Sequence, residues 1–335
     1  MKAVHGLILL QCRRIHGSYS TNVSIISASR KLRLERKQPY LQWRLLTHTS
    51  GFVYTNLNPK LKKWVNSEAA QNAPKTGTIV DSLRMPLSFE PGTGWEYGLG
   101  HDWAGVVVSR LNNTTLQAYM EKNIWAPLDI KLMTFHPDED LEVQKRLVGM
   151  SRRGPVKRGP RAPMHNSDEK VEWTDEALFE YPIVDEWGGV GSIGAPTDYI
   201  KILLSLLVND GRLLSSDMVD QMFSPQLGPD PLKAYEINKL QLYSQGTFSG
   251  LPEGTKDQFG LGSRLVMSDV ATGLREGALQ WAGLPNLLWT IDRKAGLCMF
   301  FASNLVPFGD SKIHEYQQLF EKEMYTRFGK SNSAS

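Results

Sequence analysis

The chain has 335 residues, of which 41% are hydrophobic and 22% charged, so it has an ordinary globular composition and can bury a large core. Its formal net charge of +3 is unevenly distributed along the chain. Residues 1–40 carry eight Lys or Arg and one acid, a net charge of +7, so the remaining residues have a net charge of −4. A mildly acidic body lacks the basic field that holds nucleic acid, and no apolar run approaches the roughly 18 residues of a membrane span. We therefore expect neither a nucleic-acid nor a membrane partner.

Cysteine usage favours a reducing compartment. The two cysteines, Cys12 and Cys298, make no disulfide framework, so we expect the cytoplasm. The first 34 residues are rich in Arg and Ser and poor in acids, which leaves a mitochondrial presequence as the alternative. Cys298 lies in an apolar run, which predicts a buried core thiol rather than a nucleophile.

Residues 1–40 differ from the rest and are expected to be a basic tail that is disordered or replaces genuine sequence, while 41–328 form the folded domain and 329–335 a second tail. Apolar spacing predicts a mostly helical part over about 99–223. A polar stretch at 137–175, with basic residues from Arg152 to Arg158, predicts a long exposed loop and leaves a site for an anionic partner open. The first expected helix covers 99–111. A second begins at a capping box, Thr114–Gln117, and runs to Ile124. A third runs from Ala195 to Gly211, and a short fourth runs from Ser215 to near Phe223.

Between residues 259 and 303 the spacing of apolar residues becomes that of β-strands. A helix with one apolar face is expected next, at Ser311–Phe328. Antiparallel strands followed by a helix that must cover them predict an α+β layer architecture over 259–328. The expected strands are Phe259–Met267, Gly277–Trp281, Asn286–Asp292 and Leu297–Ser303.

A tight turn at Pro91–Gly94 places Trp95 and Tyr97 at the start of a helix. A tyrosine there can act as a general acid/base where a nearby cation lowers its pKa from about 10. A packed aromatic residue with a satisfied hydroxyl is the alternative.

The segment His48-Thr49-Ser50-Gly51 invites a Ser/His pair, but residues two apart rarely point at each other. We expect instead a turn that Thr and Ser hydroxyls stabilise and in which Gly51 adopts positive φ. Further along the chain, Trp281-Ala282-Gly283 lies on an expected strand, where glycine can expose a backbone N–H to a developing oxyanion. A β-bulge at Gly283 is equally open.

Other patterns are rejected. Gly189–Gly194 matches G-x-G-x-x-G, but Tyr181–Trp187 before it is a poor buried strand, so we expect no dinucleotide cofactor. The same stretch misses the G-x-S-x-G elbow, because Val190 stands at its first glycine position. The seven histidines have no ligand-like spacing, so we expect no metal site.

In this order, the segments resemble the serine β-lactamase-like family, which includes class C β-lactamases, penicillin-binding-protein-type esterases and fungal transesterases that acylate polyketides. The resemblance covers roughly residues 41–328. Gly283–Trp289 resembles the fungal branch in particular, which favours an esterase or transesterase over a drug-degrading lactamase. The matching segments are Leu45–Gly51, Trp95–Gly98, Trp187–Asp198, Ser224–Leu227 and Gln280–Phe308.

The resemblance implies an antiparallel sheet flanked by helices with a mostly helical subdomain, of the β-lactamase/transpeptidase type. It also implies that a helical Ser attacks an ester, thioester or lactam carbonyl, while a Lys one turn later takes part in proton transfer. Tyr97 matches the catalytic tyrosine. The substrate is then a small-molecule ester or thioester, no cofactor is needed, and an acyl-carrier partner stays open. Trp281, Gly283 and Leu284 match the oxyanion strand, and His48, Ser50, Gly51 and Trp95 match structural motif positions.

The chain departs from the family where the nucleophile belongs. Upstream of His48 it offers only Ser29-Arg30-Lys31, one residue short of Ser-x-x-Lys, and just 16 residues separate Lys31 from His48. The one Ser-x-x-Lys, Ser167–Lys170, lies in the polar loop and is interpreted as chance. We therefore expect an N-terminally truncated hydrolase or acyltransferase that is inactive as written. A non-catalytic binding module or decayed enzyme is the alternative.

Overall fold

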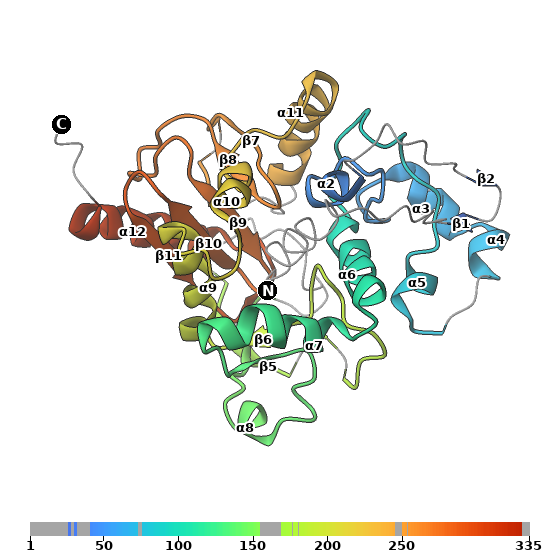
Figure 1. The fold of residues 1–335 in the computed structure, drawn as a ribbon, viewed down its shortest axis with the longest axis horizontal. Coiled ribbons are helices and arrows are strands. Elements are labelled where there is room, and N and C mark those ends of the chain that lie inside the picture. The colour runs from blue at the N-terminus through green and yellow to red at the C-terminus, as the bar shows by residue number, and fades with distance from the viewer. Residues whose placement is uncertain are drawn as a thin grey trace.

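The computed structural model shows an α+β fold, as predicted, with a five-stranded antiparallel sheet, smaller sheets and surrounding helices (Figure 1). In the view of Figure 1, the large sheet and α12 occupy the left half, and α2 to α6 lie to the right. The structure describes residues 26–27, 30–31, 41–72, 76–154, 169–175, 177–179, 181–244, 250–252 and 254–329. The expectations of a disordered tail at 1–40 and a tail at 329–335 fall almost entirely outside these residues.

The helices that the sequence predicts at 99–111, 215–223 and 311–328 are confirmed within two residues, as is the start of the helix at Pro196. The helix α11 was not predicted, because it carries prolines at both 229 and 231 and no continuous apolar stripe. The helices are α2 (Leu41–Leu46), α3 (Pro59–Val65), α4 (Glu68–Gln71), α5 (Ile79–Ser82), α6 (Gly100–Asn112), α7 (Leu116–Met120), α8 (Leu141–Gln144), α9 (Pro196–Val208), α10 (Ser216–Met222), α11 (Pro229–Ser244) and α12 (Ser311–Phe328).

The second predicted helix is shorter and begins differently. Its α-helical part, α7, ends at Met120 and continues as a π-helical turn, Glu121–Trp125, and a short 3-10 turn. The predicted capping box is wrong by one residue, because Thr115 is the N-cap and its Oγ1 accepts from the Ala118 N–H at 3.1 Å. Gln117 bonds across to the next segment rather than back to its own helix end, and its Oε1 accepts from the Phe135 N–H at 2.7 Å.

The large sheet has the order β11–β10–β9–β8–β7, with every neighbouring pair antiparallel. The single strand predicted over Phe259–Met267 is wrong, because the chain turns at 260–263, where Gly262 has φ +88. The turn makes this stretch a hairpin at the sheet edge. The five strands are β7 (Asp257–Phe259), β8 (Arg264–Val266), β9 (Leu279–Gly283), β10 (Leu287–Asp292) and β11 (Leu297–Phe301).

Different helices cover the two faces of this sheet. Side chains alternate along a strand, so neighbouring residues of β9 and β10 serve opposite faces. On one face α9 packs against the sheet, with the Tyr199 ring 4.8 Å from that of Phe300, and Trp281 joins the main core. On the other face α12 packs, with the Phe320 ring 5.8 Å from that of Phe301.

The region predicted as a long exposed loop contains a small sheet, so that prediction is wrong in part. β4 (Met150–Arg153) pairs with β5 (Val171–Thr174) and, in parallel, with β12 (Leu305–Val306). Arg153 is buried, and its Nε donates to Asp310 Oδ2 at 2.7 Å. Part of the basic stretch therefore stabilises the fold, while residues 155–168 lie outside the described part of the chain.

The glycine-rich stretch before α9 packs against α6. Tyr181–Trp187 forms no strand, and the only strand of the stretch is the two-residue β6 (Ile193–Gly194), which pairs with β3 (Met133–Thr134). The Gly189 N–H donates to Asp102 Oδ1 at 2.8 Å. The rejection of a dinucleotide fingerprint agrees with this geometry, since the fingerprint requires a buried parallel strand before the glycines.

Cys298 lies on β11 and packs against the main core. Burial raises the pKa of its thiol to about 11, so the thiolate that a nucleophile needs is disfavoured. The prediction is therefore confirmed in part, because the thiol packs against the core but is partly rather than fully buried. Within the described residues, no helix has the length and apolar character needed to cross a membrane.

Candidate functional site

Three segments that are distant in sequence meet around the buried imidazole of His48. Its ring centroid lies 4.9 Å from that of Tyr97 and 6.1 Å from that of Trp281. The rings of Tyr97 and Trp281 are themselves 5.5 Å apart. The structure therefore brings together the His48 turn, the tyrosine segment and the strand β9, each of which the sequence had marked separately.

The turn predicted at His48–Gly51 is present. His48 has φ 58 and Gly51 has φ +84, so the backbone enters the left-handed region twice. The hydroxyls of Thr47 and Thr49 lie 2.9 Å apart, and the Ser50 hydroxyl lies 3.5 Å from a backbone N–H two residues later. These hydroxyl groups bond within the turn, which supports a structural role for Ser50.

Backbone contacts to the turn hold Tyr97 from both sides. The Glu96 N–H donates to the carbonyl of His48 at 3.2 Å, and the Gly98 N–H donates to His48 Nδ1 at 3.3 Å. This second bond makes Nδ1 an acceptor and assigns the Nε2–H tautomer to neutral His48. A Cβ at Gly98 would lie 2.2 Å from the carbonyl oxygen of Phe52, so only glycine permits this close approach.

The end of β9 is open on the face that carries Trp281. Residues 281 and 283 share one face of the strand because side chains alternate. Among the described residues outside its chain neighbours, a Cβ built at Gly283 would meet only Leu287, at 3.9 Å. Pairing with β10 runs one to one from Leu279 to Gly283, which excludes the alternative of a bulge at Gly283.

Sequence reasoning missed two aromatic neighbours of His48. The ring of His101, near the start of α6, lies 4.8 Å away, and the ring of Phe259, at the end of β7, lies 5.3 Å away. Their distance from His48 along the chain gives no local signal. The described residues contain no group of three or more His, Cys, Asp or Glu that could hold a metal ion.

A cavity of about 120 Å³ adjoins Tyr97 and is bounded by α3, α11 and the tyrosine segment. Asn58 Nδ2 donates to Glu96 Oε2 at 2.9 Å, and Asn238 Nδ2 donates to the carbonyl oxygen of Trp95 at 2.6 Å. Both amides therefore tie a neighbouring helix to the segment that carries Tyr97. The lining residues are Leu57, Asn58, Pro59, Glu96, Tyr97, Asn238, Gln241 and Leu242.

Replacing Asn58 tests this tie. Asn58 Oδ1 also caps α3, accepting from the Lys60 N–H at 2.9 Å, so Asn58→Ala is expected to cost about 1–2 kcal/mol of unfolding free energy. Asp is as good an N-cap as Asn. However, Asn58→Asp would face the Glu96 carboxylate, so we expect a similar loss in urea unfolding. An unchanged midpoint for Asn58→Asp would show that Asn58 acts as a helix cap alone.

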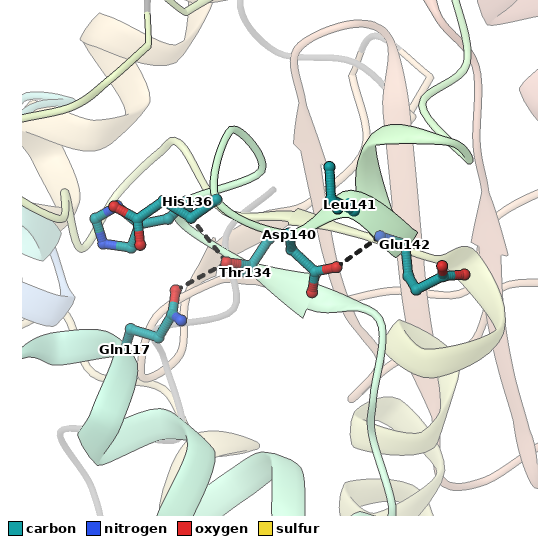
Figure 2. Close-up of a pocket in the computed structure, with 7 residues that line it drawn as sticks. Gln117, Thr134, His136, Asp140, Leu141 and Glu142 are labelled. Atoms are coloured by element: carbon teal, nitrogen blue, oxygen red, sulfur yellow. Dashed lines mark hydrogen bonds between the residues drawn. The ribbon is translucent and has the colours of Figure 1, made fainter.

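A second, more open hollow of about 420 Å³ contains no residue of the His48 cluster (Figure 2). Its polar groups largely bond each other: the Thr134 hydroxyl donates to Gln117 Oε1 at 3.0 Å, and Asp140 Oδ1 accepts from the Glu142 N–H at 2.9 Å. His136 Nε2 lies 3.0 Å from Glu186 Oε1. We therefore take the cluster around His48 and Tyr97 as the candidate site.

No described segment supplies a helical Ser-x-x-Lys. Lys31 ends the two-residue strand β2 (Arg30–Lys31), which pairs with β1 (Ile26–Ser27), so it is not on a helix. Ser29 and Ser167 lie outside the described residues.

The sequence model of the Beta-lactamase family matches residues 43–322, which is most of the chain. The chain belongs to the beta-lactamase family. The match begins just before the His48 turn and ends within α12, so it includes every segment of the site described above. The family predicted from the order of the motifs is confirmed.

Proteins similar to this chain include fungal acyltransferases and esterases. The monacolin J acid methylbutanoyltransferase of Aspergillus terreus is 33% identical over 297 residues, which are 88% of this chain and 69% of that protein. The lovastatin esterase of Penicillium rubens is 34% identical over 285 residues, which are 85% of this chain and 69% of that protein. Unliganded simvastatin synthase from Aspergillus terreus superposes with a TM-score of 0.81 and 27% identity, covering 98% of this chain and 84% of that one.

Proposed function

We propose that this chain provides the substrate site and the proton-transfer tyrosine of a serine acyl-transfer enzyme that uses an ester or thioester donor. The observation that carries the proposal is the meeting of Tyr97 with the open end of β9 around His48. The relatives named as a methylbutanoyltransferase and an esterase support acyl transfer to an alcohol or to water. An acyl carrier protein is one possible form of thioester donor.

Each group then has a defined task. A serine hydroxyl adds to the acyl carbonyl and passes its proton to the lysine one turn later in the same Ser-x-x-Lys, and the oxyanion that forms accepts hydrogen bonds from backbone N–H groups at Gly283 and Leu284. As the oxyanion collapses, the bond to the leaving alcohol or thiol breaks and Tyr97 delivers a proton to it. In the second step the tyrosine accepts a proton from the incoming alcohol or water, which adds to the acyl carbon. The ester bond to serine then breaks, and the lysine returns its proton to the serine oxygen. The His48 ring packs against Tyr97 and holds it in place, and the Trp95 ring packs against His48.

The printed sequence has no Ser-x-x-Lys before His48, so we propose that these 335 residues bind an acyl substrate without turning it over. The alternative function, a non-catalytic binding module, rests on the same observation. The two differ in whether the native protein contains a nucleophile.

Sequencing the 5′ end of the native transcript decides between them. A reading frame that encodes Ser-x-x-Lys several dozen residues before His48 supports the enzyme, and that protein is expected to hydrolyse p-nitrophenyl butyrate. Tyr97→Phe should lower its kcat about 100-fold or more. A transcript whose translation starts at Met1 as printed supports the binding module. Turnover that survives Tyr97→Phe unchanged contradicts the proposed role of Tyr97.

Gly283→Val tests the oxyanion end of β9. The new side chain would fill the open space over the strand, so binding of butyrate, the carboxylate product of a butyryl donor, is expected to weaken at least 10-fold. Valine suits a strand, so the unfolding free energy should change by less than about 1 kcal/mol. Butyrate titrations followed by ¹H–¹⁵N NMR measure both variants. Gly228→Val is the control, because a Cβ at Gly228 meets no described residue within 4 Å, so this position too has room for a side chain. Equal butyrate affinity in both variants would remove Gly283 from the site.

A further inference from the structure

We infer that Asn286 is a positioning residue that sets the place of the Gly283 and Leu284 backbone amides. The inference rests on the proposed function of this strand end. Asn286 lies in the connection between β9 and β10, and its side chain has no exposed surface. It is polar, buried and three residues from Gly283, and the mechanism above gives it no role.

The side-chain amide of Asn286 is saturated by the backbone of the segment that follows β11. Its Nδ2 donates to the carbonyl oxygens of Leu305 at 2.8 Å and Pro307 at 2.9 Å. Its Oδ1 accepts from the Gly309 N–H at 2.8 Å. Three bonds from one planar amide fix both the position and the orientation of the group, because each bond constrains a different direction.

Two further bonds anchor the same connection. Gln317 on α12 is fully buried, and its Nε2 donates to the carbonyl oxygen of Asn286 at 3.0 Å. The Ser303 hydroxyl donates to the carbonyl oxygen of Pro285 at 2.9 Å. The connection is therefore held by α12 on one side and by residues 303–309 on the other.

These hydrogen bonds also fix the positions of the Gly283 and Leu284 amides, because the connection between β9 and β10 is short. Gly283 pairs directly with Leu287, so only residues 284–286 lie between the two paired positions. Gly283 has no side chain of its own, and a Cβ there would touch only Leu287. Gly283 therefore adds no side-chain packing of its own, and the hydrogen bonds of Asn286 hold the connection beside it.

Asparagine meets both demands of position 286. Its φ is 62, a left-handed conformation that Asn tolerates better than most residues other than Gly. Asp would present a carboxylate to the carbonyl oxygens of Leu305 and Pro307, because it has no donor when ionised. Gly would keep the backbone conformation and lose all three side-chain bonds, which makes Asn286→Gly the informative substitution.

The test compares Asn286→Gly with Asn113→Gly in the 335-residue protein. Asn113 also has positive φ, at 49, but is an exposed cap of α6. We expect Asn286→Gly to shift the ¹H–¹⁵N resonances of Gly283 and Leu284 more than those of β11, and to weaken butyrate binding at least 10-fold. Asn113→Gly should leave both unchanged. Gln317→Met removes a single bond to the same loop and should act in the same direction with a smaller amplitude, which keeps the test decisive if Asn286→Gly does not fold.

Two outcomes distinguish a failure of the positioning role of Asn286 from a failure of the proposed oxyanion site. Resonances of Gly283 and Leu284 that stay within the range of Asn113→Gly, in both Asn286→Gly and Gln317→Met, overturn the positioning role. Butyrate that fails to move these resonances in the unmodified protein counts against the oxyanion site, while the shifts caused by substitution still decide whether Asn286 positions the strand.

Discussion

Replacing Arg264 with methionine is expected to lower the free energy of unfolding by about 3 kcal/mol, because it breaks a buried ion pair and leaves the carboxylate behind. Arg264 Nε lies 2.8 Å from Asp257 Oδ2, and their side chains are 3% and 0% exposed. Lys239 Nζ at 3.2 Å and the Tyr235 hydroxyl remain bonded to the carboxylate, which holds the loss at the lower end of the range for buried pairs. Urea unfolding followed by tryptophan fluorescence measures the change.

Replacing Arg264 should also disturb the candidate site. The Tyr235 ring packs edge-on against Trp95 at 4.8 Å, so disturbing Asp257 disturbs the segment that carries Tyr97. Arg327→Met is the matched control, since its pair with Glu323 leaves the two side chains 68% and 60% exposed, and it should change stability by less than about 1 kcal/mol. Equal losses for the two variants would show that the Asp257 cluster does not behave as a buried charge pair.

Stability should fall as pH rises from about 5 to 8, and Glu321→Gln should remove much of that slope. Glu321 lies on α12 against the sheet, and burial raises the pKa of its carboxyl group to about 7 from 4.5. Between pH 4.5 and 7, the Glu321 carboxyl is ionised in the unfolded chain but still protonated in the folded protein. The contribution of this group to the free energy of unfolding is therefore fully present below about pH 4.5, and it is lost as the pH rises through about 7. The difference corresponds to about 3 kcal/mol, at roughly 1.36 kcal/mol per pKa unit.

The geometry around Glu321 explains why a neutral amide is expected to serve there. Thr272 Oγ1 donates to Glu321 Oε2 at 2.6 Å and Gln280 Nε2 donates to Oε1 at 3.1 Å, so the group is buried among polar partners. Urea unfolding at pH 5 and pH 8 gives the slope for each protein. Glu323→Gln, on the exposed side of the same helix, should keep the slope of the unmodified protein. Identical slopes for Glu321→Gln and the unmodified protein would assign the pH dependence to other groups.

Local patterns in the sequence were enough for much of the fold. Three of the predicted strands and the helix at Ser311–Phe328 follow from residue periodicity, and the turn at His48–Gly51 follows from its Thr, Ser and Gly residues. The patterns failed where local signals conflict. The helix α11 has prolines near its start and no apolar stripe, and the apolar stretch after Phe259 hides a turn at Gly262.

The sequence by itself determined the family, the α+β class and the segments that hold Tyr97 and Gly283, because these depend on short patterns in a fixed order. Only the tertiary structure placed His101 and Phe259 against His48, paired Arg153 with Asp310, and joined Asn286 to the segment after β11. Arg153 and Asp310 are 157 residues apart in the chain. Such contacts leave no periodic trace in the sequence, because they depend on how the packed layers bring distant backbone together.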